Sequence, residues 1–178
     1  MHSMHRYTNT SDPFGRAPSV ITFDRETNSY VLQDNRTWIA GLSDEGGAGS
    51  FLAAGMKQSV QPNATEVAKL EDMVHQVVWG RLQVNANSTG PNSNLTYAVR
   101  KSLFYYQPDL VPGYHYDDYF NWTSWASWNL TEAYAVDRTY DYVHVSALYW
   151  GLYRAGRTNP GILQQQDAEW YLMQAYHT

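Results

Sequence analysis

An apolar segment near the end of the chain, residues 142–156, most constrains the fold. Its sequence, YVHVSALYWGLYRAG, is apolar on nearly all faces of a helix, so we expect it to be buried. Ala147, Gly151 and Ala155 recur at a spacing of four, which leaves one helix face without large side chains. This face lets another helix approach closely, so the chain is predicted to be mainly α.

Several other segments have helical patterns. Ser43 is a candidate N-cap with acidic residues after it, and the small-residue run GGAGSFLAAGM that follows permits close packing. Asn63 with Glu66 three positions later resembles a capping box, and apolar residues at helical spacing continue to about Leu82. Further helices are predicted at residues 97–106, at residues 123–135 and from Asp167.

The N-terminal part has a different pattern. Residues 19–24 and 30–34 are short β-branched or aromatic runs separated by a polar linker, which predicts a β-hairpin with a loop of four or five residues. The expected organisation is therefore an extended or β segment over residues 1–40, followed by helical hairpins over residues 41–178. Residues 84–94 are predicted to form a polar surface loop.

Composition excludes some classes of function. A net charge of −5 argues against a nucleic-acid partner, and no apolar run is long enough to span a membrane. The histidines lack metal-ligand spacing, so no metal is predicted. No phosphate-binding or dinucleotide fingerprint is present, so no cofactor is predicted.

Asparagine usage is unusual. Seven of the eleven Asn residues open an N-x-S/T sequon, where chance would give about one or two. The sequons are at Asn9, Asn35, Asn63, Asn87, Asn94, Asn121 and Asn129. The excess predicts a secreted, N-glycosylated protein; coincidence in a chain rich in Asn, Ser and Thr is the alternative.

Two further features bear on secretion. The chain has no cysteines, although small secreted domains usually need disulfides, and its first residues lack the apolar core of a signal peptide. The final helical pattern stops at Thr178 without a capping glycine or proline. We therefore expect a piece of a longer polypeptide, whose remaining part is a possible partner.

Residues 112–142 combine aromatic and acidic side chains. Aromatic ring faces stack against sugar rings, and carboxylates accept hydroxyl hydrogen bonds or move protons at a glycosidic bond. The candidate sugar-binding residues are Trp122, Trp125, Trp128, Tyr114, Tyr116 and His115. An alternative is that these aromatics form a helical core, and glycans on Asn121 and Asn129 would obstruct a cleft here.

Glycoside hydrolysis usually needs two carboxyl groups, and the acid of the pair needs a raised pKa. The candidate catalytic residues are Asp117, Asp118, Asp44 and Glu45. Asp117 and Asp118 lie between tyrosines, whereas Asp44 and Glu45 precede a glycine-rich helix start. The alternatives are a solvated turn and an ordinary helix N-terminal charge, respectively.

Two other acidic residues, Glu132 and Asp137, fit surface positions better. Arg138 follows Asp137 directly, so the expected role of these carboxylates is a salt bridge to this arginine.

Three blocks of the sequence then show a resemblance. They are WIAGLSDEGGAGSFLAAGMKQ from Trp38, LFYYQPDLVPGYHYDDYFNWTSWASWN from Leu103 and EAYAVDRTYDYVHVSALYWGLYR from Glu132. The blocks resemble a family of large secreted proteins, mainly fungal and bacterial, described as six-hairpin-glycosidase-like and carrying a domain of unknown function. The resemblance implies a β region before an (α/α)6 toroid whose central cleft binds glycans. Only two or three of six hairpins would lie in this chain.

We therefore expect a fragment of a secreted, carbohydrate-active protein that is glycoside-hydrolase-like if active, with an oligo- or polysaccharide as its partner. A non-catalytic glycan-binding or structural module is one alternative. A polysaccharide lyase is another, with Tyr114, His115 and Tyr116 near the proton that is removed, and Arg100, Lys101 and Arg138 near the uronate. A truncated product without a role of its own would expose apolar surface on residues 143–155.

Overall fold

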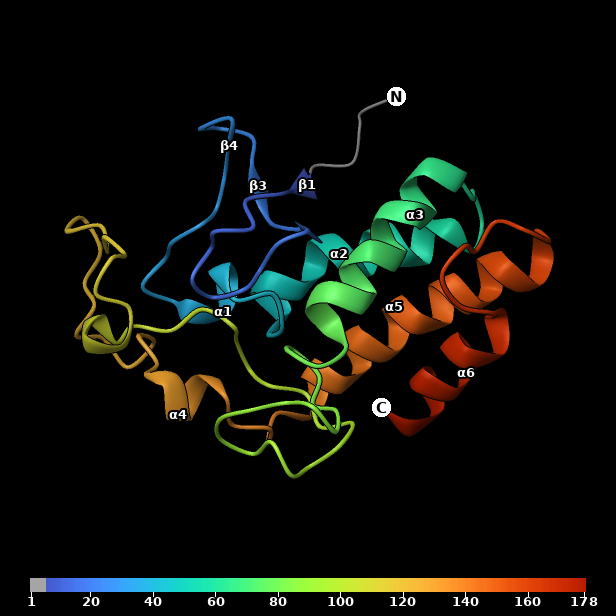
Figure 1. Cartoon of the computed structure of the whole chain (residues 1–178). Coiled ribbons are helices and arrows are strands. Elements are labelled where there is room, and N and C mark those ends of the chain that lie inside the picture. The colour runs from blue at the N-terminus through green and yellow to red at the C-terminus, as the bar shows by residue number, and fades with distance from the viewer. Residues whose placement is uncertain (1–5) are drawn as a thin grey trace.

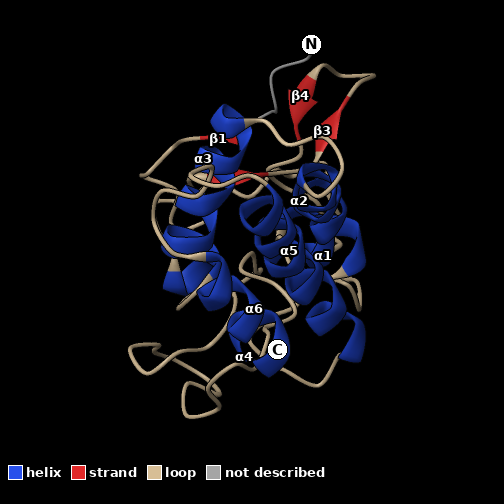
Figure 2. Ribbon diagram, turned by 90° about the vertical axis from the view of Figure 1, so that its right-hand side faces the viewer, coloured by secondary structure: helices blue, strands red, loops and turns tan. Residues whose placement is uncertain are grey.

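The computed structural model describes residues 6–178. Its longest helices form two antiparallel hairpins that lie side by side (Figure 1). The first hairpin pairs α2 (Glu45–Gln58) with α3 (Ala64–Met73), and the second pairs α5 (Thr139–Thr158) with α6 (Ala168–His177). The prediction of a mainly α chain built from helical hairpins is confirmed at this level, and Figure 2 shows the strands at one end of the helices.

The first helices of the two hairpins, α2 and α5, are parallel neighbours. Asp44, the N-cap of α2, forms an ion pair with Arg138, the N-cap of α5. Further along both helices, Gly151 faces the backbone of Gly55, so closely that a Cβ on Gly151 would overlap the Gly55 carbonyl group. The predicted small-residue face therefore brings the two helices into close contact.

The second helices, α3 and α6, also contact each other. Glu71 of α3 is fully buried, and its carboxylate accepts a hydrogen bond of 2.9 Å from the Tyr171 hydroxyl of α6. The same carboxylate accepts the backbone N–H groups of Gln164 and Gln165, which lie just before α6. Because three donors satisfy the buried Glu71 carboxylate, its burial costs little free energy. These hydrogen bonds connect the two hairpins.

The helix starts follow the expected capping chemistry with one correction. Asn63 caps α3 by accepting the N–H of Glu66 at 3.1 Å, and Asp167 caps α6. The cap of α2 is Asp44 and not Ser43, because the Asp44 carboxylate accepts the N–H of Glu45 at 2.7 Å. The α3 pattern continues as the π-helix η1 (Val74–Val78) and ends there, before Leu82.

Four two-residue strands form two antiparallel pairs. β3 (Phe23–Asp24) pairs with β4 (Ser29–Tyr30) across a four-residue loop, which confirms the predicted hairpin. The preceding β2 (Ser19–Val20) pairs with β1 (Arg6–Tyr7) and packs against α3. The buried residues of these strands join the core of the helices, and the boundary at residue 40 stays a prediction.

Two predicted helices are wrong. Residues 97–106 are extended, because their backbone groups bond to other segments: Tyr97 N–H donates to the Val84 carbonyl and Val84 N–H to the Ala98 carbonyl, both at 2.8 Å, and Leu103 N–H donates to the Gly41 carbonyl. Residues 123–135 are mostly turns, and only α4 (Leu130–Ala133) is helical. The Asn121 side chain accepts the N–H of Thr123 and the Ser127 hydroxyl donates to the Asn121 carbonyl, and such local bonds compete with a helix, whereas the Asn129 side chain caps α4. Two short elements, α1 (Thr37–Ala40) and η2 (Pro108–Leu110), were not predicted.

The α5 helix is not buried on every face. Val145, Leu148 and Leu152 are fully buried, but Val143 and Trp150 are exposed beside α6. They line an apolar hollow between α5 and α6. Within the described residues, no helix has the length and apolar character needed to cross a membrane.

The contact between Gly55 and Gly151 gives a direct test of the fold. Gly151→Ala is expected to destabilise the protein by about 1 to 3 kcal/mol, because the added methyl group forces the two helices apart. Gly49→Ala is the matched control, since a Cβ on this α2 glycine meets no atom within 4 Å. That control should stabilise α2 by about 0.5 to 1 kcal/mol, and urea unfolding measures both changes. Equal effects of the two substitutions would contradict the close packing.

Candidate functional site

The starts of α2 and α5 bring two buried carboxyl groups together. Asp44 is 1% exposed and Asp141, in the first turn of α5, is 0% exposed. Arg138 lies beside Asp44, with its Nε 2.6 Å from Oδ2 outside hydrogen-bond geometry and its Nη2 donating to Oδ1 at 3.3 Å. Neither oxygen of Asp141 has a hydrogen-bond partner among residues 6–178. We call Asp44, Lys101, Arg138 and Asp141 the helix-start cluster.

The environments of Asp141 and Asp44 affect the pKa values of the two carboxyl groups differently. Burial, and then the neighbouring charge of Asp44, raises the pKa of Asp141 to about 8. Burial also raises the pKa of Asp44, but the N–H of Glu45 and the charge of Arg138 oppose this effect. Around neutral pH Asp141 is therefore mainly a neutral acid, while Asp44 has a cationic partner. Such a pair fits acid–base chemistry.

Lys101 is the second cation of the helix-start cluster. Its Nζ lies 2.6 Å from Glu132 and 3.0 Å from Asp137, and the hydrogen bond from Lys101 is the main reason that the pKa of Asp137 is lowered. The salt-bridge partner of both acidic residues is thus Lys101, whereas we expected Arg138. The buried Trp128 ring lies next to both cations. Its centroid is 5.4 Å from Lys101 Nζ and 5.7 Å from the Arg138 guanidinium carbon.

The other candidate catalytic residues lie elsewhere. Glu45 is exposed on the first turn of α2. Asp117 and Asp118 occupy an exposed turn, where the Asp117 carboxylate accepts the N–H of Tyr119 at 2.9 Å. The structure therefore does not bring Asp44 together with Asp117 and Asp118. Asp141 was missed in the sequence, although an acidic residue in the first turn of an apolar helix was a visible signal.

The three tryptophans do not share one face. Trp122 is half-buried and stacks on Tyr106, with ring centroids 4.9 Å apart and an interplanar angle of 6°. Trp125 is 82% exposed and Trp128 is buried, and their rings contact Trp38 with centroids 5.3 and 5.2 Å away, respectively. They follow a series of turns and not a helix, so their spacing of three does not align them.

A separate surface hollow is lined by tyrosines. It has a volume of about 720 Å³ and lies between the N-terminal segment and residues 105–114. Tyr7, Tyr105 and Tyr114 line it, and burial raises the pKa of Tyr114 to about 12, so that its hydroxyl keeps its proton. Asn9, Ser11 and Gln33 add polar groups. We call this cavity the tyrosine hollow.

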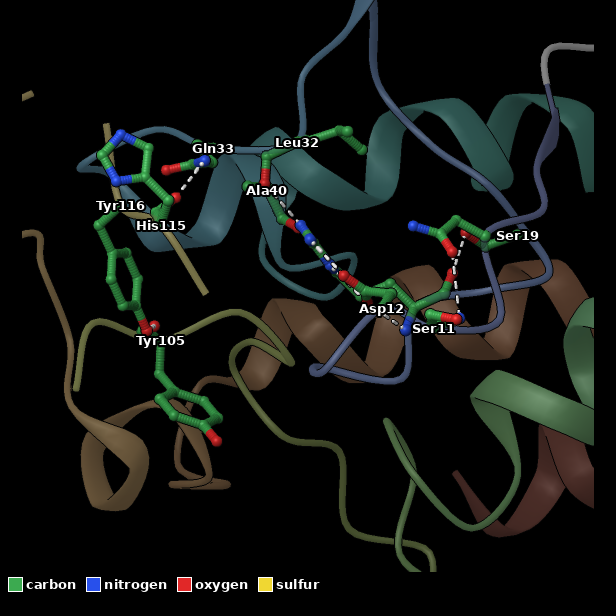
Figure 3. A network of polar contacts seen from close by, with 11 residues as sticks. Ser11, Asp12, Ser19, Leu32, Gln33, Ala40, Tyr105, His115 and Tyr116 are labelled. Atoms are coloured by element: carbon green, nitrogen blue, oxygen red, sulfur yellow. Dashed lines mark hydrogen bonds and ion pairs between the residues drawn. The ribbon is translucent and has the colours of Figure 1, made fainter. Parts of the chain in front are cut away.

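A buried ion pair between Asp12 and Arg16 is among the residues that line the hollow, and Figure 3 shows the polar contacts around Asp12. Arg16 is 1% exposed, and its Nη2 and Nε lie 2.8 and 3.0 Å from the two carboxylate oxygens of Asp12. Its Nη1 donates to the carbonyl oxygens of Leu32 and Ala40 at 2.7 and 2.8 Å. The bidentate pair balances the charge of the hollow and holds three segments in place.

Only one predicted sugar-binding residue, Tyr114, lines the tyrosine hollow. Tyr116 is buried, and its hydroxyl donates to the Tyr105 carbonyl at 2.8 Å. His115 is exposed, and its carbonyl accepts a hydrogen bond from Gln33 (Figure 3).

Most of the sequons are accessible. The Asn residues at positions 9, 87, 94, 121 and 129 are exposed, whereas Asn35 and Asn63 are half-buried and take part in local hydrogen bonds. Asn9 lines the tyrosine hollow, so a glycan on it would lie at the cavity. Over residues 6–178, no group of three or more His, Cys, Asp or Glu side chains has a metal-binding arrangement.

A family model described as a family of unknown function, DUF5695, matches residues 1–178. The chain belongs to the DUF5695 family. No curated protein and no solved structure matches it. The family match agrees with the domain of unknown function that the resemblance implied, and it brings no activity to this DUF5695 chain.

The buried acid at Asp141 predicts a pH-dependent stability. Because its folded pKa of about 8 lies above the unfolded value, the protonated group favours folding at low pH, and this contribution is lost as the pH rises through about 8. Asp141→Asn should therefore change stability little near pH 4 and stabilise the protein above pH 7. The gain should approach about 1.4 kcal/mol per pH unit between the two pKa values.

Thermal unfolding of the variant and the wild-type protein from pH 4 to 9 measures this difference. The matched control is Asp137→Asn, which removes an exposed carboxylate with a lowered pKa and should give no gain at high pH. A pH-independent difference for Asp141→Asn would show that Asp141 is ionised in the folded protein.

Proposed function

We propose that the chain binds a neutral oligosaccharide in the tyrosine hollow, as part of a carbohydrate-active protein. The observation that carries this proposal is a cavity with tyrosine walls and a charge-balanced ion pair among its lining residues. The volume of about 720 Å³ is within the range of roughly 300–1,000 Å³ that small-ligand sites have.

The chemistry of the cavity favours a sugar over other small ligands. Tyrosine faces accept the C–H faces of a pyranose ring, and the hydroxyl, amide and carboxylate groups match its hydroxyls. Because Asp12 and Arg16 neutralise each other, an uncharged polyol meets no net electrostatic opposition. A large apolar ligand would leave the polar groups without partners, which costs free energy.

The helix arrangement supports placing the chain in a six-hairpin, (α/α)6-toroid-like array. The first helices of adjacent hairpins run parallel, as do the second helices, and each hairpin is antiparallel within itself. Neighbouring hairpins of such an array need this relation. The exposed sequons support secretion and N-glycosylation as parts of the same proposal.

Hydrolysis of glycosidic bonds is the second candidate function. The specific observation in its favour is the pKa of about 8 at Asp141 beside Asp44, which suits a general acid with a second carboxylate. Both carboxyl groups are buried, so a substrate reaches them only after the surrounding side chains move. The lyase alternative has less support, because Tyr114 and Arg100 line different cavities.

Binding in the tyrosine hollow is tested with a glycan array followed by calorimetry on the wild-type chain. Tyr114→Ala removes a ring from the cavity wall and should weaken binding about tenfold, the size expected for loss of a stacking partner. Tyr119→Ala is the control, because Tyr119 is exposed and lies outside the hollow.

A second variant, at the surface, distinguishes a loss of binding from a loss of folding. Gly113 also lines the hollow, and a Cβ there meets no atom within 4 Å, so Gly113→Trp should narrow the cavity without disturbing the core. Glycan binding that survives both Tyr114→Ala and Gly113→Trp would refute the proposed site.

Hydrolysis has its own test, in which reducing ends released from fungal and plant polysaccharides are measured. We expect Asp141→Asn and Asp44→Asn each to reduce the rate at least about a hundredfold, as loss of a general acid or base does. Asp118→Asn should retain the wild-type rate, because this exposed residue lies away from the helix-start cluster. A rate that depends on Asp118 and not on Asp141 would move the catalytic centre to the turn.

A further inference from the structure

A second cavity, which we call the arginine pocket, is lined by two guanidinium groups. It has a volume of about 350 Å³ and lies between the surface loop of residues 80–89 and Tyr134. Arg81 and Arg100 line it together with Asn87 and Thr89, and no acidic side chain is among its lining residues. The pocket therefore carries a local positive charge in a protein whose net charge is −5.

Arg100 is the buried member of the pair. It is 3% exposed, and its Nη1 and Nη2 donate to the carbonyl oxygens of Arg81 and Thr89 at 2.8 and 2.6 Å. The Tyr134 ring lies 4.0 Å from its guanidinium carbon, while its Nε is buried without a hydrogen-bond partner. Within residues 6–178 no carboxylate pairs with it, so a buried cation is left without a counter-charge.

Arg81 supplies the accessible charge. Its side chain is exposed and forms no ion pair with any described residue. It packs over Gly15, which has a positive φ of 67° and where a Cβ would overlap the guanidinium. The absence of a side chain at Gly15 thus allows Arg81 to lie at the pocket.

We propose that the arginine pocket binds a small oxyanion, either the carboxylate of an acidic monosaccharide unit or a phosphate or sulfate group. Guanidinium groups bind these anions through paired N–H donors, and Arg100 retains N–H groups beyond those used by the two carbonyls. Asn87 and Thr89 line the pocket where the remainder of a sugar would lie. The inference does not depend on the glycan site in the tyrosine hollow.

The test is calorimetric titration of the 178-residue chain at low ionic strength with sodium glucuronate, phosphate and sulfate. Neutral glucose is the reference. The chain is made without N-glycosylation, because Asn87 belongs to a sequon and lines the pocket. We expect saturable binding of at least one anion, and weaker binding as salt is added.

Arg81→Gln should weaken this binding about tenfold or more, because it removes a charged donor from an exposed position without cutting into the core. Arg154→Gln is the matched control, since Arg154 is exposed on α5 and lies outside the pocket. Arg100→Lys keeps the charge and loses the paired donors, so it should also weaken binding.

The three anions distinguish an acidic sugar from a phosphate or sulfate group as the source of the oxyanion. Tighter binding of glucuronate than of phosphate and sulfate assigns an acidic sugar, and the opposite order assigns a phosphate or sulfate group. Failure of all three anions to bind, or unchanged binding by Arg81→Gln, overturns the proposal. If Arg100→Lys fails to fold, the Arg81→Gln result still decides.

Discussion

The close approach of α2 and α5 determines where the helix starts and their side chains lie. With glycines at the crossing, the two backbones touch without side chains between them, and this fixes how far one helix slides along the other. Because the helices are parallel, both N-termini arrive at the same end. Two positive helix ends then lie side by side, which is unfavourable unless negative groups join them. Asp44 supplies such a charge and also pairs with Arg138, whereas Asp141 is mainly protonated at neutral pH and adds little charge there.

A long connection joins the two hairpins. Because α3 runs antiparallel to α2, the chain leaves η1 at the end of the helices where α5 begins, and residues 79–138 lie between these two points. This connection has little regular secondary structure and is fixed by hydrogen bonds to the helix starts, such as Asp44 N–H to the Lys101 carbonyl at 3.1 Å. Its aromatic residues form a second core around Phe14, Phe104 and Trp128. The cavities with candidate binding functions lie along this connection and the N-terminal segment that it packs against.

Local signals in the sequence predicted the helices well where they act through neighbouring residues. The Asn63 cap and the Asp167 start depend on interactions within about a turn of helix, and the small-residue spacing at Gly151 is visible within its own helix although it acts through Gly55 of α2. The 97–106 segment has a helical composition but takes hydrogen-bond partners from residues 41, 82–84 and 128–135, which no local pattern reveals. The sequence drew attention to Asp44, but not to Asp141 or to the Asp12–Arg16 pair. The meeting of Asp44 and Asp141 depends on how distant segments pack, whereas Asp12 and Arg16 are only four residues apart but lie outside any helix.

The two proposed cavities lie on either side of one short turn, and charge pairing decides how they differ. Pro13 and Arg16 line the tyrosine hollow, while Phe14 between them lines the arginine pocket. Arg16 has a bidentate carboxylate partner in Asp12, so its burial leaves no net charge facing the hollow. Arg100 is buried almost as completely, yet its partners are two carbonyl oxygens and an aromatic ring, which carry only partial charges. Since a buried cation is stabilised only in part by such partners, the arginine pocket favours an anion, whereas the hollow favours a neutral ligand.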